Sequence, residues 1–159
     1  MSDRVTNVVV AGLGGQGVIK ASDILADAAF RTGSDVKKSE VHGMSQRGGS
    51  VTSAVRYGRE VLSPMVTDGE ADCLVVLEAT QVEVNRQVLR PDGALIVPDA
   101  VDEKALVNRR SLNVALLGVL SCHLDIPVSV WQEAIRAAFP EKLVEANLQA
   151  FEVGRAIGK

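Results

Sequence analysis

The sequence predicts an α/β protein with three layers, α/β/α, around a mixed, mostly parallel sheet that contains one antiparallel hairpin and a Rossmann-like first strand–helix unit. Residues 6–11 (TNVVVA) are a β-branched run that leads through a glycine loop into a helical pattern. Residues 73–78 (CLVVLE) are almost wholly apolar, as in strands buried on both faces. Residues 50–57 alternate apolar and polar side chains, which is typical of a hairpin strand.

The first helix is expected to start directly after the glycine loop and to run for about 15 residues, because apolar side chains recur every three or four positions. Its apolar stripe consists of Val18, Ala21, Leu25 and Ala28. Gly33 stands where a C-terminal cap belongs. A second strand is predicted at residues 35–41, and residues 50–57 and 60–62 are predicted to pair as a hairpin around Gly58 and Arg59.

In the second half, a strand at residues 73–78 is predicted to lead into a helix at 81–89, with Thr80 and Glu83 as a capping box. A turn at 91–93 should then open a parallel strand at 94–97. Residues 111–124 are apolar on nearly every side, so this helix should be covered by protein all round, for which a subunit interface is one route.

The last two helices are predicted around Trp131, with Ser129 and Gln132 as a capping box, and from Pro140 to the end. The sequence contains no internal repeat or linker, so residues 1–159 are expected to form a single domain.

Composition excludes several classes of function. The 159 residues carry a net charge of −3, and only 3% are aromatic, so the chain offers neither a basic surface nor stacking platforms for nucleic acid. No apolar run approaches the roughly 20 residues that cross a bilayer. We therefore expect a cytoplasmic protein without nucleic-acid or membrane partners.

The two cysteines, Cys73 and Cys122, are too far apart in sequence to form a metal-binding or redox motif of the CxxC type. Both lie in apolar runs, which favours buried structural thiols. The sequence therefore predicts no metal site in this chain.

The glycine loop matches the dinucleotide-binding pattern G-x-G-x-x-G at Gly12, Gly14 and Gly17. That pattern also expects an acid about 20 positions later, at the end of the second strand. Asp35 lies at the wrong end and Glu40 slightly late. Contact with a phosphate or cofactor, packing against another subunit, and simple turn geometry all remain open. The candidate cofactor-binding residues are Gly12, Gly14, Gly15, Gln16 and Gly17.

A second candidate segment follows the predicted second strand, at an edge of the sheet where ligands collect in α/β proteins. His42 and Arg47 are candidate catalytic residues, because imidazole titrates near neutrality and guanidinium binds carboxylate or phosphate. Docking onto a partner chain is the alternative. The segment's candidate residues for contact with a substrate or partner are Glu40, His42, Gly43, Met44, Gln46, Arg47, Gly48 and Gly49.

Six segments occur in the order found in a known family: GLGGQG, RGG, SPMV, ADCLVVLE, NVALLG and NLQAF. Over nearly its whole length the chain resembles the gamma-type (domain III) component of 2-oxoacid:ferredoxin oxidoreductases. Within that family, SEVHGMSQRGGSV is most similar to the small beta subunit of indolepyruvate ferredoxin oxidoreductases. The stretch 99–113 looks shorter than in many relatives.

The resemblance implies a small non-redox subunit that supports oxidative decarboxylation of an aryl 2-oxoacid, with coenzyme A as co-substrate and ferredoxin as electron acceptor. A larger catalytic subunit would carry thiamine diphosphate, magnesium and iron–sulfur clusters, and this chain alone would bind none of them. The isolated chain could also form a homo-oligomer. Two alternatives remain: a self-contained NAD(P)- or flavin-binding oxidoreductase, and a non-catalytic assembly module.

Overall fold

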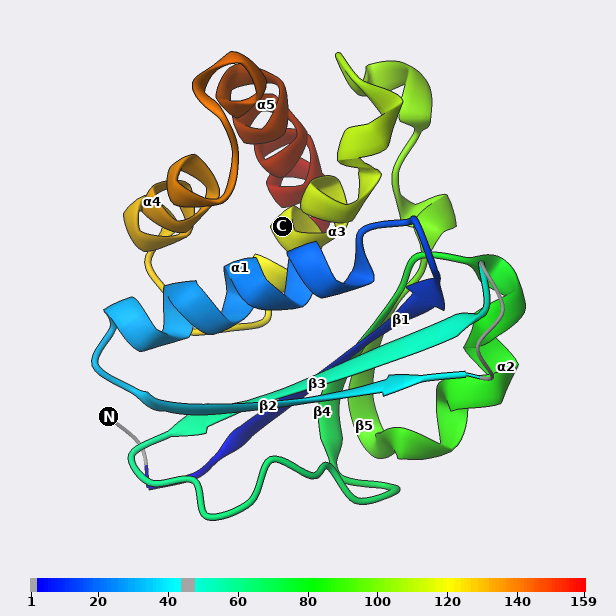
Figure 1. The fold of residues 1–159 in the computed structure, drawn as a ribbon, viewed down its shortest axis with the longest axis vertical. Coiled ribbons are helices and arrows are strands. Elements are labelled where there is room, and N and C mark those ends of the chain that lie inside the picture. Colours follow the sequence, from blue (N-terminus) through cyan, green and yellow to red (C-terminus); the bar gives the residue numbers. More distant parts are fainter. Residues whose placement is uncertain (1–2, 44–47) are drawn as a thin grey trace.

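Five strands form one mixed sheet in the computed structural model, which describes residues 3–43 and 48–159 (Figure 1). The strands are β1 Thr6–Leu13, β2 Asp35–His42, β3 Ser50–Gly58, β4 Ala71–Val76 and β5 Leu89–Ile96. Their order across the sheet is β2-β3-β1-β4-β5. β4 is parallel to β1 and β5, whereas β3 is antiparallel to β1 and β2. The predicted mixed α/β fold is confirmed, and β3 is the strand that runs against the others.

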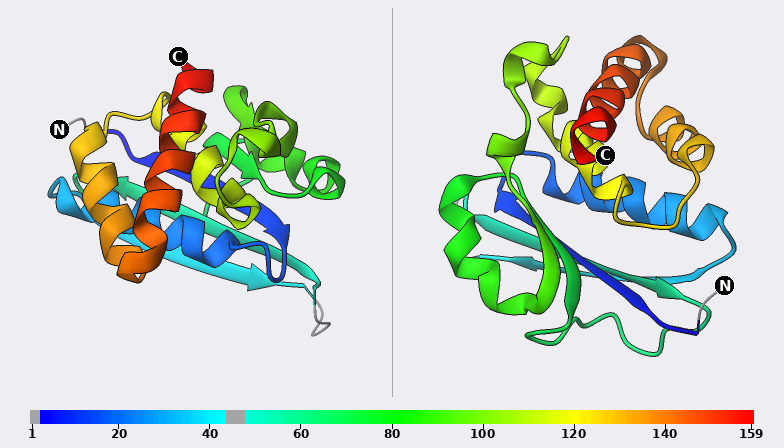
Figure 2. Two further views of the ribbon diagram at one scale, coloured as in Figure 1. Left: turned by 90° about the horizontal axis from the view of Figure 1, so that it is seen from above. Right: turned by 180° about the vertical axis from the view of Figure 1, so that it is seen from behind.

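Helices cover the two faces of the sheet unequally. The α-helices are α1 Val18–Arg31, α2 Val82–Asn85, α3 Leu112–Ser121, α4 Val128–Ala138 and α5 Glu141–Gly158. α1, α3, α4 and α5 lie on one face, with α4 and α5 farther from the sheet (Figures 1 and 2). The other face is covered by α2 and its flanking 3-10 turns. None of the helices in the described ranges is both long and apolar enough to span a membrane.

Both faces of the central strands are apolar because helices or turns cover both. Val8 and Val10 of β1 belong to the larger apolar cluster, under α1, α3, α4 and α5. Val9 and Ala11 point the opposite way into a smaller cluster, where α2 contributes Val82. The alternation of side chains along a strand thus explains why β1 has an uninterrupted apolar run.

α3 is buried within the chain itself, mainly by α5. The two helices cross at Gly118 and Gly154, and the α-carbon of each lies 3.0 Å from where a β-carbon on the other would stand. Glycine at both positions lets the two backbones touch. The all-round cover predicted for this helix therefore comes from the protein's own sheet and helices, without another subunit.

The predicted hairpin around Gly58 and Arg59 is wrong. The hairpin consists of β2 and β3, and residues 60–62 form no strand. β3 instead pairs along its full length with β1 on its other side. The Asp35 carboxylate accepts a hydrogen bond from the Val61 N–H (2.8 Å), which holds the segment after β3 beside the start of β2.

The predicted helix at 81–89 and turn at 91–93 are also wrong. The helix is divided into 3-10 and α turns that end at Val88, and the turn residues lie inside β5. Pro91 is tolerated there because β5 is an edge strand. Neither capping box forms. The Thr80 N–H bonds to Glu78, and Ser129 lies inside α4, which Pro127 precedes.

Cys73 provides a test of the burial around β4 in alkaline solution. Burial raises the pKa of the Cys73 thiol from its ordinary 9.0 to about 11, and burial also raises the pKa of Tyr57. The unfolded chain therefore loses these protons first, so stability should fall as the pH rises from about 9 towards 11. Cys73→Ala is expected to remove about 2 kcal/mol of this loss, measured by urea unfolding at pH 8 and 10.5. Equal losses in the variant and the unmodified chain would contradict the prediction.

Candidate functional site

The loop of residues 12–17 and the described part of the second candidate segment (residues 40–43, 48 and 49) lie at one edge of the sheet, where β1 and β2 end (Figure 1). β3 is antiparallel to both strands, so its first residues lie at the same edge. The register shows this directly, because Leu13 pairs with Ser50 and His42 pairs with Val51. The topology thus brings together the two segments that the sequence singled out separately.

The two loops contact each other through their main chains. The Gly14 N–H donates to the Gly49 carbonyl (2.9 Å), which joins the first loop to the second segment. Within the second segment, the Gly43 N–H donates to the Ser50 carbonyl (2.6 Å). A β-carbon on Gly14 would lie 3.3 Å from the Gly48 nitrogen. A small cavity of about 160 Å³ remains at this junction, lined by Gly14, His42, Gly43, Gly48, Gly49, Ser50 and Val51.

Gln16 connects the first loop to β1 and to the end of β4. Its Oε1 accepts a hydrogen bond from the Leu13 N–H (2.7 Å), and its Nε2 donates to Glu78 Oε1 (3.2 Å). Glu78 was not among the residues predicted for this site. A carboxylate at the end of the otherwise apolar run 73–78 could have indicated it.

Asn113 holds the other end of the first loop. Its Nδ2 donates to the Gly17 carbonyl (3.2 Å) from the buried start of α3. Gly17 has φ +84°, and a β-carbon there would overlap the Asn113 amide. Asn113 was not among the residues predicted for this site either. An amide within an apolar helix could have indicated it, because a buried polar group needs a hydrogen-bond partner.

Glu40 and His42 lie on the exposed end of β2. His42 is 61% exposed, and its Nε2 lies 3.8 Å from Glu40 Oε1. Lys38 Nζ donates to the other Glu40 oxygen (2.9 Å). His42 also lines the small cavity, whereas the candidates Met44, Gln46 and Arg47 lie outside the described residues.

The topology at this edge differs from that of a dinucleotide-binding domain. There, the first two strands are parallel neighbours and the second ends in the ribose-binding acid. Here β3 separates β1 from β2, so Glu40 lies two strands away from β1. Gly48 and Gly49 also occupy the space beside Gly14, where a pyrophosphate would approach.

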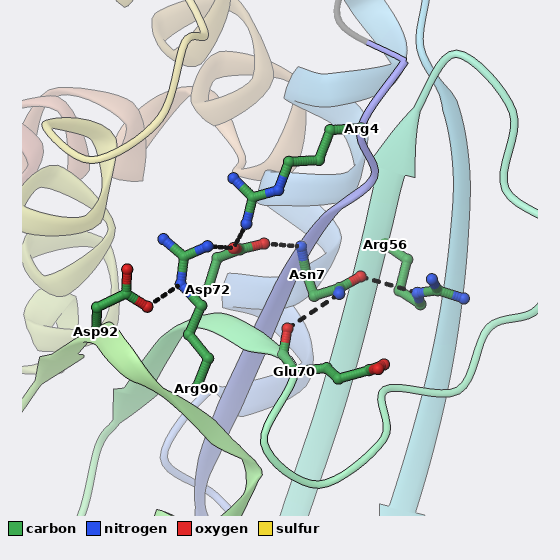
Figure 3. Close-up of polar contacts among 7 residues, drawn as sticks. All are labelled: Arg4, Asn7, Arg56, Glu70, Asp72, Arg90 and Asp92. Atoms are coloured by element: carbon green, nitrogen blue, oxygen red, sulfur yellow. Dashed lines mark hydrogen bonds and ion pairs between the residues drawn. The ribbon is translucent and has the colours of Figure 1, made fainter.

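A larger cavity of about 760 Å³ lies at the opposite edge, where β1 and β4 begin. Asp72 forms part of its wall and accepts a hydrogen bond from the Asn7 N–H (2.7 Å). Asp72 also pairs with Arg4 and with Arg90, whose Nη1 is 2.7 Å away (Figure 3). Asn7 extends the network, because its side-chain oxygen accepts from Arg56 Nε (2.8 Å). This network of paired charges connects β1, β3, β4 and β5.

Metal-ligating side chains do not gather within the described part of the chain. In residues 3–43 and 48–159, no three His, Cys, Asp or Glu side chains are placed to hold a metal ion. Cys73 lies on β4 and Cys122 follows α3. These residues do not fit an iron–sulfur cluster, which needs several thiolates around one site.

The fold and this edge define a class of α/β protein in which the loop of residues 12–17 contacts Gly48 and Gly49 where the strands of a mixed sheet end. The chain belongs to the pyruvate ferredoxin/flavodoxin oxidoreductase family, whose model matches residues 7–105 and 99–157. The two matched segments overlap at 99–105, within the stretch that the sequence suggested to be short.

Relatives align over almost the whole chain. Indolepyruvate oxidoreductase subunit IorB from Thermococcus kodakarensis is 33% identical over 93% of this chain and 93% of its own length. The subunit of the same name from Archaeoglobus fulgidus is also 33% identical, over 93% and 92%. The common gamma subunit of the pyruvate/ketoisovalerate oxidoreductases of T. kodakarensis is 28% identical over 89% and 90%. The predicted family is therefore confirmed.

Solved structures share the fold. The gamma subunit of a keto/oxoacid ferredoxin oxidoreductase from Geobacter sulfurreducens has a TM-score of 0.81 at 21% identity, over 98% of this chain and 97% of its own. A 2-oxoglutarate:ferredoxin oxidoreductase from Magnetococcus marinus, with 2-oxoglutarate, coenzyme A and succinyl-CoA bound, has a TM-score of 0.84 at 23% identity. That match covers 99% of this chain and 31% of the longer chain, so this chain spans about a third of it.

Proposed function

We propose that this chain is the small subunit of a cytoplasmic aryl 2-oxoacid:ferredoxin oxidoreductase that acts on indolepyruvate or a similar arylpyruvate, with coenzyme A as co-substrate. The observation that carries the proposal is the alignment with IorB subunits at 30–33% identity over 93% of this chain. The matches to the pyruvate/ketoisovalerate and pyruvate synthase subunits are weaker, at 28–29% identity.

In this proposal the larger subunit holds thiamine diphosphate, magnesium and the iron–sulfur clusters. Thiamine diphosphate supplies the electron sink for decarboxylation. The present chain would contribute no redox group and would instead help to form the cleft for substrate and coenzyme A. Residues 12–17 and 40–49 would form one wall of the cleft for substrate and coenzyme A, and the contact between the two loops supports their acting as a unit. His42 and Arg47 are the side chains there that could bind a carboxylate or phosphate.

Co-expression with the larger subunit tests the proposal. We expect ferredoxin reduction that depends on an arylpyruvate, on coenzyme A and on both subunits, because neither chain holds a complete site. Pyruvate and 2-oxoglutarate are the matched control substrates and should be turned over more slowly. Full activity of the larger subunit alone would contradict the proposal.

The self-contained oxidoreductase is tested on the isolated chain. The separation of β1 from β2 and the filled space beside Gly14 both oppose dinucleotide binding. Calorimetric titration with NAD, NADP and FAD should therefore give no binding heat. Saturable binding of any of them would support that alternative instead.

A further inference from the structure

We infer that Gln16 and Glu78 are a positioning pair that fixes the loop of residues 12–17 in one conformation, so that the loop meets its partner as a preformed surface. The identity of that partner, the larger subunit, rests on the proposed function. The fixing of the loop does not, because it depends only on contacts within this chain.

The three glycines of the pattern are each explained by a contact within the chain. A β-carbon on Gly12 would lie 2.9 Å from Gln16 Oε1 and 2.9 Å from Val18 Cγ2. Gly14 is held close to Gly48, and Gly17 close to Asn113. The glycines thus let the loop fold against the rest of the protein, which gives the pattern a role that needs no ligand.

Gln16 occupies the centre of these contacts. The Gln16 N–H donates to the Leu13 carbonyl (3.2 Å), while the Leu13 N–H donates to Gln16 Oε1 (2.7 Å). The Gln16 side-chain Nε2 donates to Glu78 Oε1 (3.2 Å). The position needs an acceptor and a donor on one side chain, which glutamine provides and glutamate does not.

The residue left facing open space is Gly15. It is exposed, it has φ +91°, and a β-carbon there would have no neighbour within 4 Å. The loop therefore has a fixed base, made by Gln16 and Glu78, and an exposed tip of bare main chain. A partner can approach that tip closely without reorganising the loop, and such preorganisation lowers the entropic cost of binding.

Exchanging the two side chains tests the pair. Gln16→Glu places two carboxylates against each other and should open the loop, whereas Glu78→Gln keeps an oxygen that can accept from Gln16. The double variant Gln16→Glu/Glu78→Gln restores one hydrogen bond in the reverse direction. We expect association with the larger subunit to weaken about 10-fold or more in Gln16→Glu alone, and to return to within about 3-fold of the unmodified protein in the double variant.

Hydrogen exchange at the Leu13 amide gives a readout on the isolated chain, independent of any partner. Exchange should be slow in the unmodified protein and in the double variant, and at least about 10-fold faster in Gln16→Glu. Gln149→Glu is the matched control, because Gln149 also bonds two main-chain groups, on Ala105 and Val107, remote from the loop. It should leave both readouts unchanged.

The outcomes separate the two proposals. If Glu78→Gln fails to rescue Gln16→Glu in the exchange experiment, or if Gln16→Glu leaves Leu13 protected, the positioning pair is overturned. If the pair behaves as expected but the unmodified chain does not bind the larger subunit, the proposed function fails and the positioning of the loop stands.

Discussion

Gly154→Ala is expected to destabilise the protein by about 3 kcal/mol, although glycine-to-alanine changes in helices normally stabilise by up to about 1 kcal/mol. The reason is the crossing of α3 and α5. A β-carbon on Gly154 would overlap the Ala115 carbonyl, and Gly118 lies directly opposite. The helices would have to separate, and the packing of Phe151 and its neighbours in the larger cluster would loosen with them.

Urea unfolding of the isolated chain measures this effect. Glu152→Ala, on the exposed side of the same helix, is the matched control and should change stability by less than about 0.5 kcal/mol. Gly118→Ala should behave like Gly154→Ala, because its β-carbon would overlap the Phe151 carbonyl. A Gly154→Ala protein as stable as the unmodified chain would show that the helices are not in backbone contact.

Asp72→Ala is expected to cost about 3 kcal/mol of folding free energy. The Asp72 side chain is 9% exposed and accepts hydrogen bonds or ion pairs from the Asn7 N–H, Arg4 and Arg90 (Figure 3). Its removal leaves the buried Asn7 N–H without its acceptor and Arg90 without its nearest carboxylate. Arg4 contributes least, because its side chain is 60% exposed and solvent screens the pair.

Thermal and urea unfolding both measure the loss. Arg59→Ala provides the matched control, because the Arg59 and Asp3 side chains are 72% and 86% exposed, and a pair of that kind contributes little. Asp72→Asn keeps an oxygen for the Asn7 N–H and should lose less stability than Asp72→Ala. If Asp72→Ala were no more destabilised than Arg59→Ala, the network would be a surface feature.

Local patterns were sufficient to predict β1, α1 and β2, whose ends lie within two residues of the expected positions. Each is defined by its own periodicity and by an adjacent glycine. The hairpin failed because the partner of β3 is chosen by the whole sheet. Gly58 and Arg59 look like a turn locally, but β3 gains two full-length neighbours by lying between β1 and β2.

At the candidate site, the sequence identified both glycine loops but not what holds them. Glu78 and Asn113 lie 62 and 96 positions from their partners in the first loop, just after β4 and on α3. No local pattern connects residues at such separations. The glycine pattern alone therefore left phosphate or cofactor contact, subunit packing and turn geometry open, because the internal contacts of Gly12, Gly14 and Gly17 depend on the tertiary fold.

The central place of β1 also constrains how the chain is made. β1 is synthesised before both strands that flank it, which are β3 at residues 50–58 and β4 at residues 71–76. Until both have left the ribosome, a strand that is apolar on both faces has no permanent neighbours. Such nascent segments are prone to pair with other chains. β1 gains its second neighbouring strand only when β4 has been synthesised, so residues 6–58 depend on residues 71–76 to complete their pairing.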